Sequence, residues 1–143
     1  MPLNVEHLLR TADTLEQALI AIENHKRRDD VLFDLYRNAA IKSFELSLET
    51  AGKLLRKALK AFGGNPREVD KLVFKDVLRH AGKHGLLDTP AVERWLAYRA
   101  NRNSTAHDYG EGFANETLTL LPQYLHDVRR IAPQIQVVFD AAA

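Results

Sequence analysis

Residues 30–64, DVLFDLYRNAAIKSFELSLETAGKLLRKALKAFGG, form the segment that decides the fold class. Its apolar side chains recur every three or four residues, which is the spacing of one face of an α-helix. These positions are Leu32, Leu35, Tyr36, Ala39, Ala40, Phe44, Leu48, Ala51, Leu54, Leu55, Ala58, Leu59 and Phe62. Glycines at 63 and 64 follow the last of them, as glycines commonly follow a helix end. The spacing predicts one long helix from about Asp30 to Phe62 with one side buried.

The two ends of the chain show the same period. A first helix is predicted to begin at Asn4 as its N-cap and to end in the charged turn at residues 24–29. The last helical region is predicted to begin at Asn115-Glu116. Because proline lacks the N–H that a helix needs, Pro122 and Pro133 predict a kink or a division into short segments there.

Two helix starts divide the middle of the chain. Asn65-Pro66-Arg67-Glu68 combines a capping residue, a proline at the first helical position and a glutamate three residues after the cap. It predicts a third helix that runs to about His84 and stops at Gly85. Thr89-Pro90 repeats the cap and the proline, and it predicts a fourth helix that continues through Arg99.

No segment shows the alternation of a β-strand, and the predicted helices are joined by short turns. Such helices bury their apolar stripes against one another. The sequence therefore predicts an all-α fold, an up-and-down antiparallel bundle of four main helices plus a shorter one, as a single domain over residues 1–143.

Composition narrows the classes of function. The chain has no cysteine, which excludes disulfides, thiolate nucleophiles and cysteine-ligated zinc. Its formal net charge of +1 lacks the basic excess of dedicated nucleic-acid binders, so any such contact must be local. No segment approaches the ~20 apolar residues of a membrane span, and the N-terminal residues contain no apolar run of signal-peptide length. These features predict a cytoplasmic protein that is not bound to a membrane.

Two pairs of side chains invite a functional interpretation and favour a simpler one. His80 and His84 are one helical turn apart, a spacing that can hold a metal, but no third ligand is evident nearby. We therefore predict a partly exposed histidine face, with no metal and no cofactor. Trp95 and Tyr98 could stack on bases, but a place in or beside the core is the favoured interpretation.

The stretch of residues 99–111, RANRNSTAHDYGE, gathers guanidinium, amide, hydroxyl, imidazole and phenol groups. If the fourth helix continues through His107, Asn103 and Ser104 share its face and Arg99 lies two turns back. If the helix ends near residue 106, His107 can turn toward Arg102. Both alternatives stay open at this stage.

This set of groups suits phosphate chemistry. An imidazole such as His107 can give or take a proton near neutral pH. An arginine such as Arg102 can bind two phosphate oxygens at once, where negative charge builds in a transition state. The pair suits attack by a ribose 2′-hydroxyl on its own 3′-phosphate without a metal, which restricts the substrate to RNA. The simpler interpretation, a hydrophilic helix end that satisfies open carbonyls, is favoured by spacing alone.

A family resemblance favours phosphate chemistry over the simpler interpretation of a hydrophilic helix end. Arg102-x4-His107-x-Tyr109 after a long helical hairpin resembles the signature of the HEPN superfamily. The longer string, which adds Asn103 and Glu111, resembles the branch of nucleotidyltransferase substrate-binding subunits, relatives of the HepT toxins. Ser43-Phe44-Glu45-Leu46 and Asn65-Pro66-Arg67-Glu68-Val69 add to the resemblance, which spans about residues 10–130.

The resemblance implies a helical homodimer whose two motifs face each other across a shared cleft, and a minimal nucleotidyltransferase encoded beside it. In one version the subunit is a metal-independent endoribonuclease, with His107 as acid and base and Arg102 as phosphate ligand. The transferase would then silence it by attaching AMP to Tyr109. In the other version the chain binds a substrate or nucleotide for the transferase and catalyses nothing. Either version makes Arg99, Asn103, Ser104 and Tyr109 candidate substrate-binding residues.

Two positions depart from the pattern of that branch. Ala51-Gly52 stands where bulkier aromatic residues are expected, which predicts a local difference in packing. Gly110 follows Tyr109, where an acidic or amide residue is more usual. Neither departure touches Arg102, His107 or Tyr109.

Overall fold

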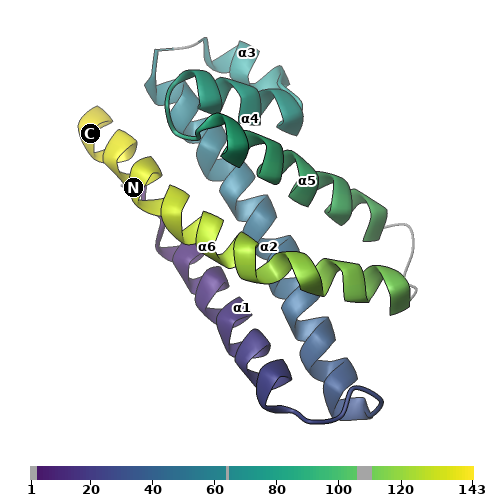
Figure 1. Cartoon of the computed structure of the whole chain (residues 1–143). Helices are drawn as coiled ribbons and strands as arrows, with labels where there is room; N and C mark the ends of the chain where they lie inside the picture. The colour runs from purple at the N-terminus through teal and green to yellow at the C-terminus, as the bar shows by residue number, and fades with distance from the viewer. Residues whose placement is uncertain (1–2, 64, 106–110) are drawn as a thin grey trace.

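The computed structural model describes residues 3–63, 65–105 and 111–143, and within these ranges the chain forms six helices and no strand. The helices are α1 (Glu6–Asn24), α2 (Val31–Ala61), α3 (Pro66–Lys71), α4 (Phe74–Lys83), α5 (Thr89–Thr105) and α6 (Glu111–Ala142) (Figure 1). The predicted all-α class is confirmed. Four helices are long, as predicted, but two are short where one was expected.

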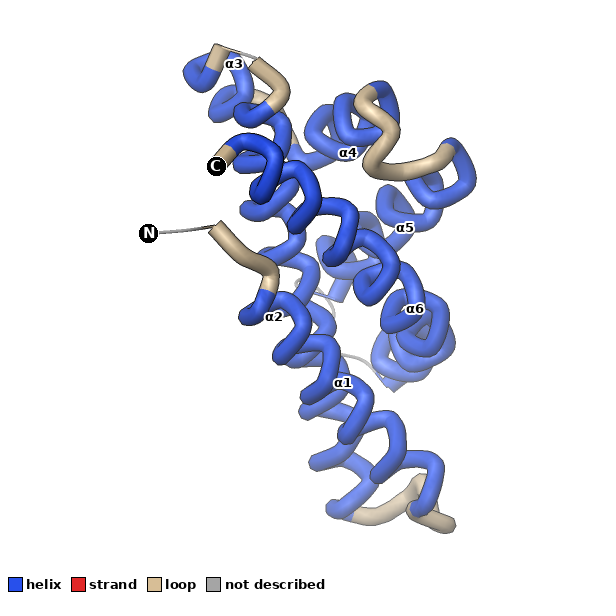
Figure 2. The backbone as a smooth tube through the Cα atoms, turned by 90° about the vertical axis from the view of Figure 1, so that its left-hand side faces the viewer, coloured by secondary structure: helices blue, strands red, loops and turns tan. Residues whose placement is uncertain are grey.

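The long helices form the body of the molecule. Figures 1 and 2 show α1 and α2 as an antiparallel hairpin with α6 packed along it, while α3 and α4 lie near the C-terminal end of α2. α5 packs on α2, α4 and α6. The largest side chains with almost no exposed surface are Trp95, Tyr124, Phe44, Leu8, Leu15, Leu48, Leu55, Leu78, Leu121, Ile131, Ile135 and Val77. In the described part of the chain, no helix is both long and apolar enough to cross a bilayer.

The helix predicted from residues 30–64 is confirmed with its ends. The Asp30 side chain accepts a hydrogen bond of 2.9 Å from the Phe33 N–H and so caps α2. At the other end, Gly63 has a φ of +85°, a left-handed conformation that favours glycine just after a helix. The 31 residues of α2 span about 46 Å at 1.5 Å per residue. This length lets α2 contact each of the other helices.

The single helix predicted from the Asn65 cap to His84 is wrong, because the structure has two helices there. The chain is extended at Leu72 and Val73, with ψ values of 135° and 159°. Val69 and Leu78 are both buried. At about 100° per residue, the nine steps between them would place them on opposite sides of one straight helix. The break lets both side chains face the core, and Arg56 Nη1 donates to the Val69 carbonyl at 2.9 Å where α3 ends.

The cap of α5 differs from the prediction by one residue. The Asp88 side chain accepts the Ala91 N–H at 2.8 Å, and its carbonyl accepts the Val92 N–H at 3.0 Å. Thr89 is already the first residue of the helix. Asp88 therefore takes the capping role that the sequence assigned to Thr89.

The last helix is longer and less interrupted than predicted. α6 begins at Glu111 and runs to Ala142 with Pro122 and Pro133 inside it, so the predicted division into short segments is wrong. Both prolines are exposed. On the solvent side, water can hydrogen-bond the carbonyls that lose a partner to proline, and the buried face of α6 stays continuous.

Candidate functional site

The candidate residues lie where α5 ends and α6 begins. The buried Thr117 side chain on α6 donates a hydrogen bond of 2.9 Å to Asn101 Oδ1 on α5. This hydrogen bond links α5 to α6, the two helices that border residues 106–110. His107 and Tyr109 fall outside the described residues, so both alternatives for the end of this helix remain predictions. Ser104 lies in α5, and its side chain is also outside the description.

Arg102 continues the buried stripe of α5. Trp95 and Tyr98 are 0% and 2% exposed, and Arg102 follows at the next helical spacing of four residues, partly exposed. Trp95 and Tyr98 pack edge-to-face with ring centroids 5.8 Å apart. Their burial confirms that they belong to the core. The backbone of Arg102 is thereby held at the edge of a rigid aromatic cluster, one turn beyond Tyr98.

Arg99 and Asn103 lie on a different face of α5, where they line a groove shared with α4. The Arg99 guanidinium carbon lies 5.1 Å from the centroid of the Phe74 ring, within the range of a cation–π contact. The structure thus separates the described candidate residues into two groups, with Arg102 on the core stripe and Arg99 and Asn103 in the groove.

The groove also contains two cations that sequence analysis missed, Lys75 and Arg79 on α4. They are four residues apart, so they share one face of the helix. That spacing was the available signal, but within a single helix from residue 65 to 84 it does not show which neighbour the face meets. Because the chain is extended at Leu72 and Val73, α4 can turn this face toward α5.

A buried carboxylate orients α5 on α6. Asp127, with a side chain 2% exposed, accepts hydrogen bonds from Arg94 Nε at 2.9 Å and Tyr98 Oη at 2.5 Å, and another from Gln123 Nε2 at 3.2 Å. Burial by itself would raise the pKa of Asp127, but these donors outweigh it and lower the pKa below the usual range. The same burial, together with the hydrogen bond to Asp127, raises the pKa of Tyr98. Asp127 therefore stays ionised and holds two side chains of α5.

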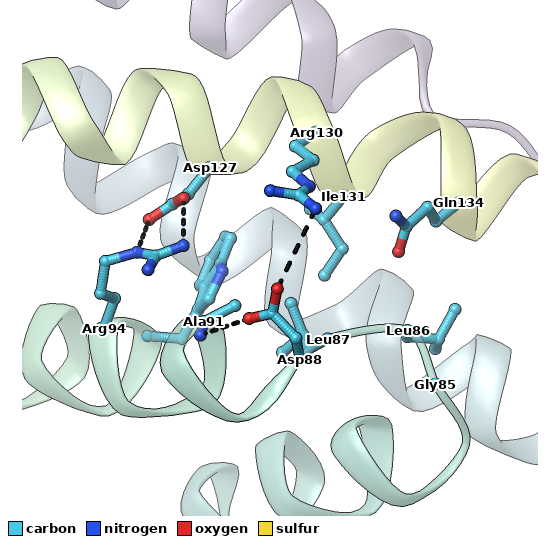
Figure 3. Close-up of a pocket in the computed structure, with 11 residues that line it drawn as sticks. Gly85, Leu86, Leu87, Asp88, Ala91, Arg94, Asp127, Arg130, Ile131 and Gln134 are labelled. Carbon is cyan, nitrogen blue, oxygen red and sulfur yellow. Dashed lines mark hydrogen bonds and ion pairs between the residues drawn. The ribbon is translucent and has the colours of Figure 1, made fainter.

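Figure 3 shows the pairing of Arg94 with Asp127 at one side of a small pocket between α5 and α6. Arg94 contacts Asp127 there. Arg130 Nη2 lies 4.0 Å from Asp88 Oδ2, and Asp88 also caps α5. Among the described residues, these charges pair across the two helices. We interpret the pocket as part of the packing that positions α5.

One of the two histidines considered as metal ligands has a packing role. His84 stacks on Phe62, with ring centroids 4.3 Å apart and an angle of 4° between the planes. Phe62 is the C-cap of α2, and His84 is the C-cap of α4. The contact joins two helix ends, as the simpler interpretation of a partly exposed face would allow.

The described helices and the polar joint between α5 and α6 define a small all-helical protein with its candidate chemistry at a helix end. A sequence model of the family described as "Nucleotidyltransferase substrate binding protein like" matches residues 3–137. The chain belongs to this family, which confirms the branch indicated by the motif.

Three matches from the comparisons with known proteins illustrate the relationship. A Haemophilus influenzae protein named "Probable ribonuclease HepT" is 27% identical over 137 residues, covering 94% of this chain and 92% of that protein. A solved structure from the same species, described as a substrate binding domain of a nucleotidyltransferase, has a TM-score of 0.83 at 26% identity, over 93% of this chain and 99% of that one. A Thermus thermophilus structure shares the fold, with a TM-score of 0.73 at 23% identity over 90% and 98% of the two chains.

Proposed function

We propose that this chain is the HEPN-type subunit of a two-component module with a minimal nucleotidyltransferase, and that it is a metal-independent endoribonuclease. The observation that carries the proposal is the position of Arg102 and Asn103 in the last described turn of α5, five and four residues before His107 in the sequence. Family membership and the relative named as a probable ribonuclease support it.

The proposed reaction needs one proton acceptor and one anion ligand. His107 takes the proton of a ribose 2′-hydroxyl, and the 2′-oxygen forms a bond to the adjacent phosphorus. The bond from phosphorus to the 5′-oxygen breaks, and the leaving 5′-oxygen takes a proton from solvent. Arg102 stabilises the charge that builds on the phosphoryl oxygens. Asn103 orients a polar group between His107 and Arg102. The products are a 2′,3′-cyclic phosphate and a 5′-hydroxyl.

The products provide the test. Purified protein incubated with RNA and a metal chelator should give 2′,3′-cyclic phosphate ends, and the same oligonucleotide with 2′-deoxyribose throughout should stay intact. Cleavage of the deoxy substrate, 3′-hydroxyl products, or no cleavage of RNA would refute the proposed reaction.

A second candidate function is a non-catalytic subunit that binds the nucleotide or substrate of the transferase. The descriptions of the family and of the Haemophilus structure favour it. It predicts a stable complex with the transferase and no RNA cleavage. Coexpression of the two chains tests it, because failure to co-purify would argue strongly against a subunit of either kind.

A further inference from the structure

The groove between α4 and α5 concentrates positive charge beside the candidate site. Of the eight described residues that line it, three are cationic, one is an amide, four are apolar and none is acidic: Lys75, Arg79, Arg99, Asn103, Val73, Phe74, Leu96 and Ala100. The whole chain has a net charge of only +1, so this is a local excess. A cationic groove attracts an anionic occupant, and its apolar half suits an occupant that also has apolar faces.

One residue of the motif lines the groove. Asn103 lies there two residues before Thr105, the last described residue of α5. His107 follows four residues after Asn103 in the sequence. An RNA strand bound in the groove would therefore contact the motif at Asn103.

We propose that this groove binds the single-stranded RNA next to the cleaved phosphate, with Lys75, Arg79 and Arg99 contacting phosphates. The identity of the polyanion as RNA rests on the proposed function. A single strand is favoured over a duplex because its bases are unpaired and can lie on the apolar side chains, whereas a duplex hides its base faces. α4 thereby supplies substrate contacts that the motif itself does not contain.

Gly52 on α2 determines where Arg99 can lie. A Cβ at position 52 would overlap the ring of Phe74, so only glycine lets that ring rest against α2. The ring in turn lies under the Arg99 guanidinium. The departure at Ala51-Gly52 is therefore explained by an aromatic ring that comes from α4 and not from α2. Gly52 and Phe74 are positioning residues for Arg99.

The ion pair between Arg79 and Asp76 does not prevent Arg79 from binding a phosphate. Asp76 lies 3.6 Å from Arg79 Nη1, and the two side chains are 45% and 54% exposed. Exposed pairs of this kind contribute little to stability, so Arg79 can exchange Asp76 for a phosphate at small cost.

Binding to an uncleavable RNA tests the groove separately from the chemistry. The probe is a fluorescent 2′-O-methyl oligonucleotide of about 12 nucleotides, within the range of known single-strand sites. The methyl group blocks the 2′-oxygen as a nucleophile, so the probe stays intact while its binding is measured. We expect K75Q/R79Q to raise Kd by roughly tenfold and to reduce the slope of log K against log salt by about 1.4, about 0.7 for each lost phosphate contact.

The control removes the same charge elsewhere. R10Q/K26Q lies on α1 and in the α1–α2 turn, away from α4 and α5, and it should leave Kd and the slope unchanged. An equal loss in both double variants, no loss in K75Q/R79Q, or tighter binding of a matched duplex would overturn the proposal. Loss of transferase binding by K75Q/R79Q with unchanged RNA affinity would assign the groove to the protein partner and would also overturn it.

The two proposals fail differently. If the wild type cleaves no RNA but K75Q/R79Q still weakens binding, the ribonuclease function is wrong and the groove stands. If cleavage depends on His107 but K75Q/R79Q binds normally, the groove is wrong and the function stands.

Gly52 gives a second, independent test. G52A should displace the Phe74 ring into solvent and weaken RNA binding severalfold. The free energy of unfolding of G52A should differ from that of wild type by less than about 1 kcal/mol. Alanine stabilises a helix by about 1 kcal/mol relative to glycine, and this gain offsets the loss of the packed ring. G82A, a matched substitution in α4, places its Cβ 3.0 Å from a Val92 methyl group. That methyl group must shift by a few tenths of an ångström, but no groove cation lies on it, so Kd should stay unchanged. Unchanged binding by G52A would refute the positioning role.

Discussion

Asp127 on α6 binds two side chains of α5 and so helps to fix how the two helices pack. It is buried and yet charged, because Arg94, Tyr98 and Gln123 all donate to it. The sequence carried a signal for it, since an acidic residue lies in the apolar stripe of the last helix between Tyr124 and Ile131. Its partners could not be predicted, because they depend on the rotation of a different helix.

We predict that D127N lowers the free energy of unfolding at pH 7 by about 2 kcal/mol, because it weakens the bond to Arg94 and the hydrogen bond from Tyr98. Chemical denaturation measures this. A value within 0.5 kcal/mol of wild type, as expected for an ordinary surface change, would contradict the assigned role (roughly the surface range).

The same residue predicts a pH dependence. The folded-state pKa of Asp127 is lowered, so its contribution is fully present above its unfolded pKa, near 3.9, and is lost as the pH falls through the folded value. The difference in unfolding free energy between wild type and D127N should therefore shrink as the pH falls below about 4. A difference that stays constant would show that the carboxylate charge is not responsible.

Helix ends are where the elements depart from their predicted bounds. The long apolar stripe of α2 is a property of its own sequence, and both of its ends were predicted. The break at Leu72 and Val73 was not predicted, because it serves the burial of Val69 and Leu78 against α2. Likewise, Asp88 and Thr89 are both good capping residues, and only the hydrogen bonds separate them.

The cap of α5 gives a prediction at this scale. D88A should lower the unfolding free energy by about 1 kcal/mol, because it removes the acceptor for the Ala91 N–H. T89A should change it by less than about 0.5 kcal/mol, as for a surface residue without a capping role. Thermal unfolding of the two variants measures the difference. A larger loss of stability in T89A than in D88A would show that Thr89 is the cap.

The hydrogen bond between Thr117 on α6 and Asn101 on α5 gives another prediction at this scale. T117V keeps the shape of the side chain but leaves Asn101 Oδ1 without its donor, which should cost about 1 kcal/mol. T119V removes an exposed hydroxyl that bonds only within α6, and it should be close to neutral. Equal stability of the two variants would mean that the hydrogen bond does not hold the joint.

At the scale of the whole molecule, helical period and turn residues were enough to predict the all-α class, since nearly every stripe had to be buried against another. The candidate site was less predictable. The residue types of the motif indicated phosphate chemistry, but the division of Arg102 from Arg99 and Asn103 depends on how α5 is rotated against α4 and α6. Lys75 and Arg79 line the groove beside Arg99 and Asn103, and their placement follows the separation of α3 from α4.

The homodimer implied by the family resemblance remains a prediction. Sedimentation of the purified chain should give twice the monomer mass of 16.2 kDa. Sedimentation as a monomer across the micromolar range would contradict a shared cleft with two motifs.

The most direct test of the account is the rate of RNA cleavage by H107A beside wild type and H126A. His126 is an exposed histidine on α6 and has no role in the proposed reaction. We predict that H107A loses activity by about 10²- to 10⁴-fold, as expected for a general acid–base residue, and that H126A cleaves like wild type. Equal cleavage by H107A and wild type would contradict the central claim that His107 moves the proton.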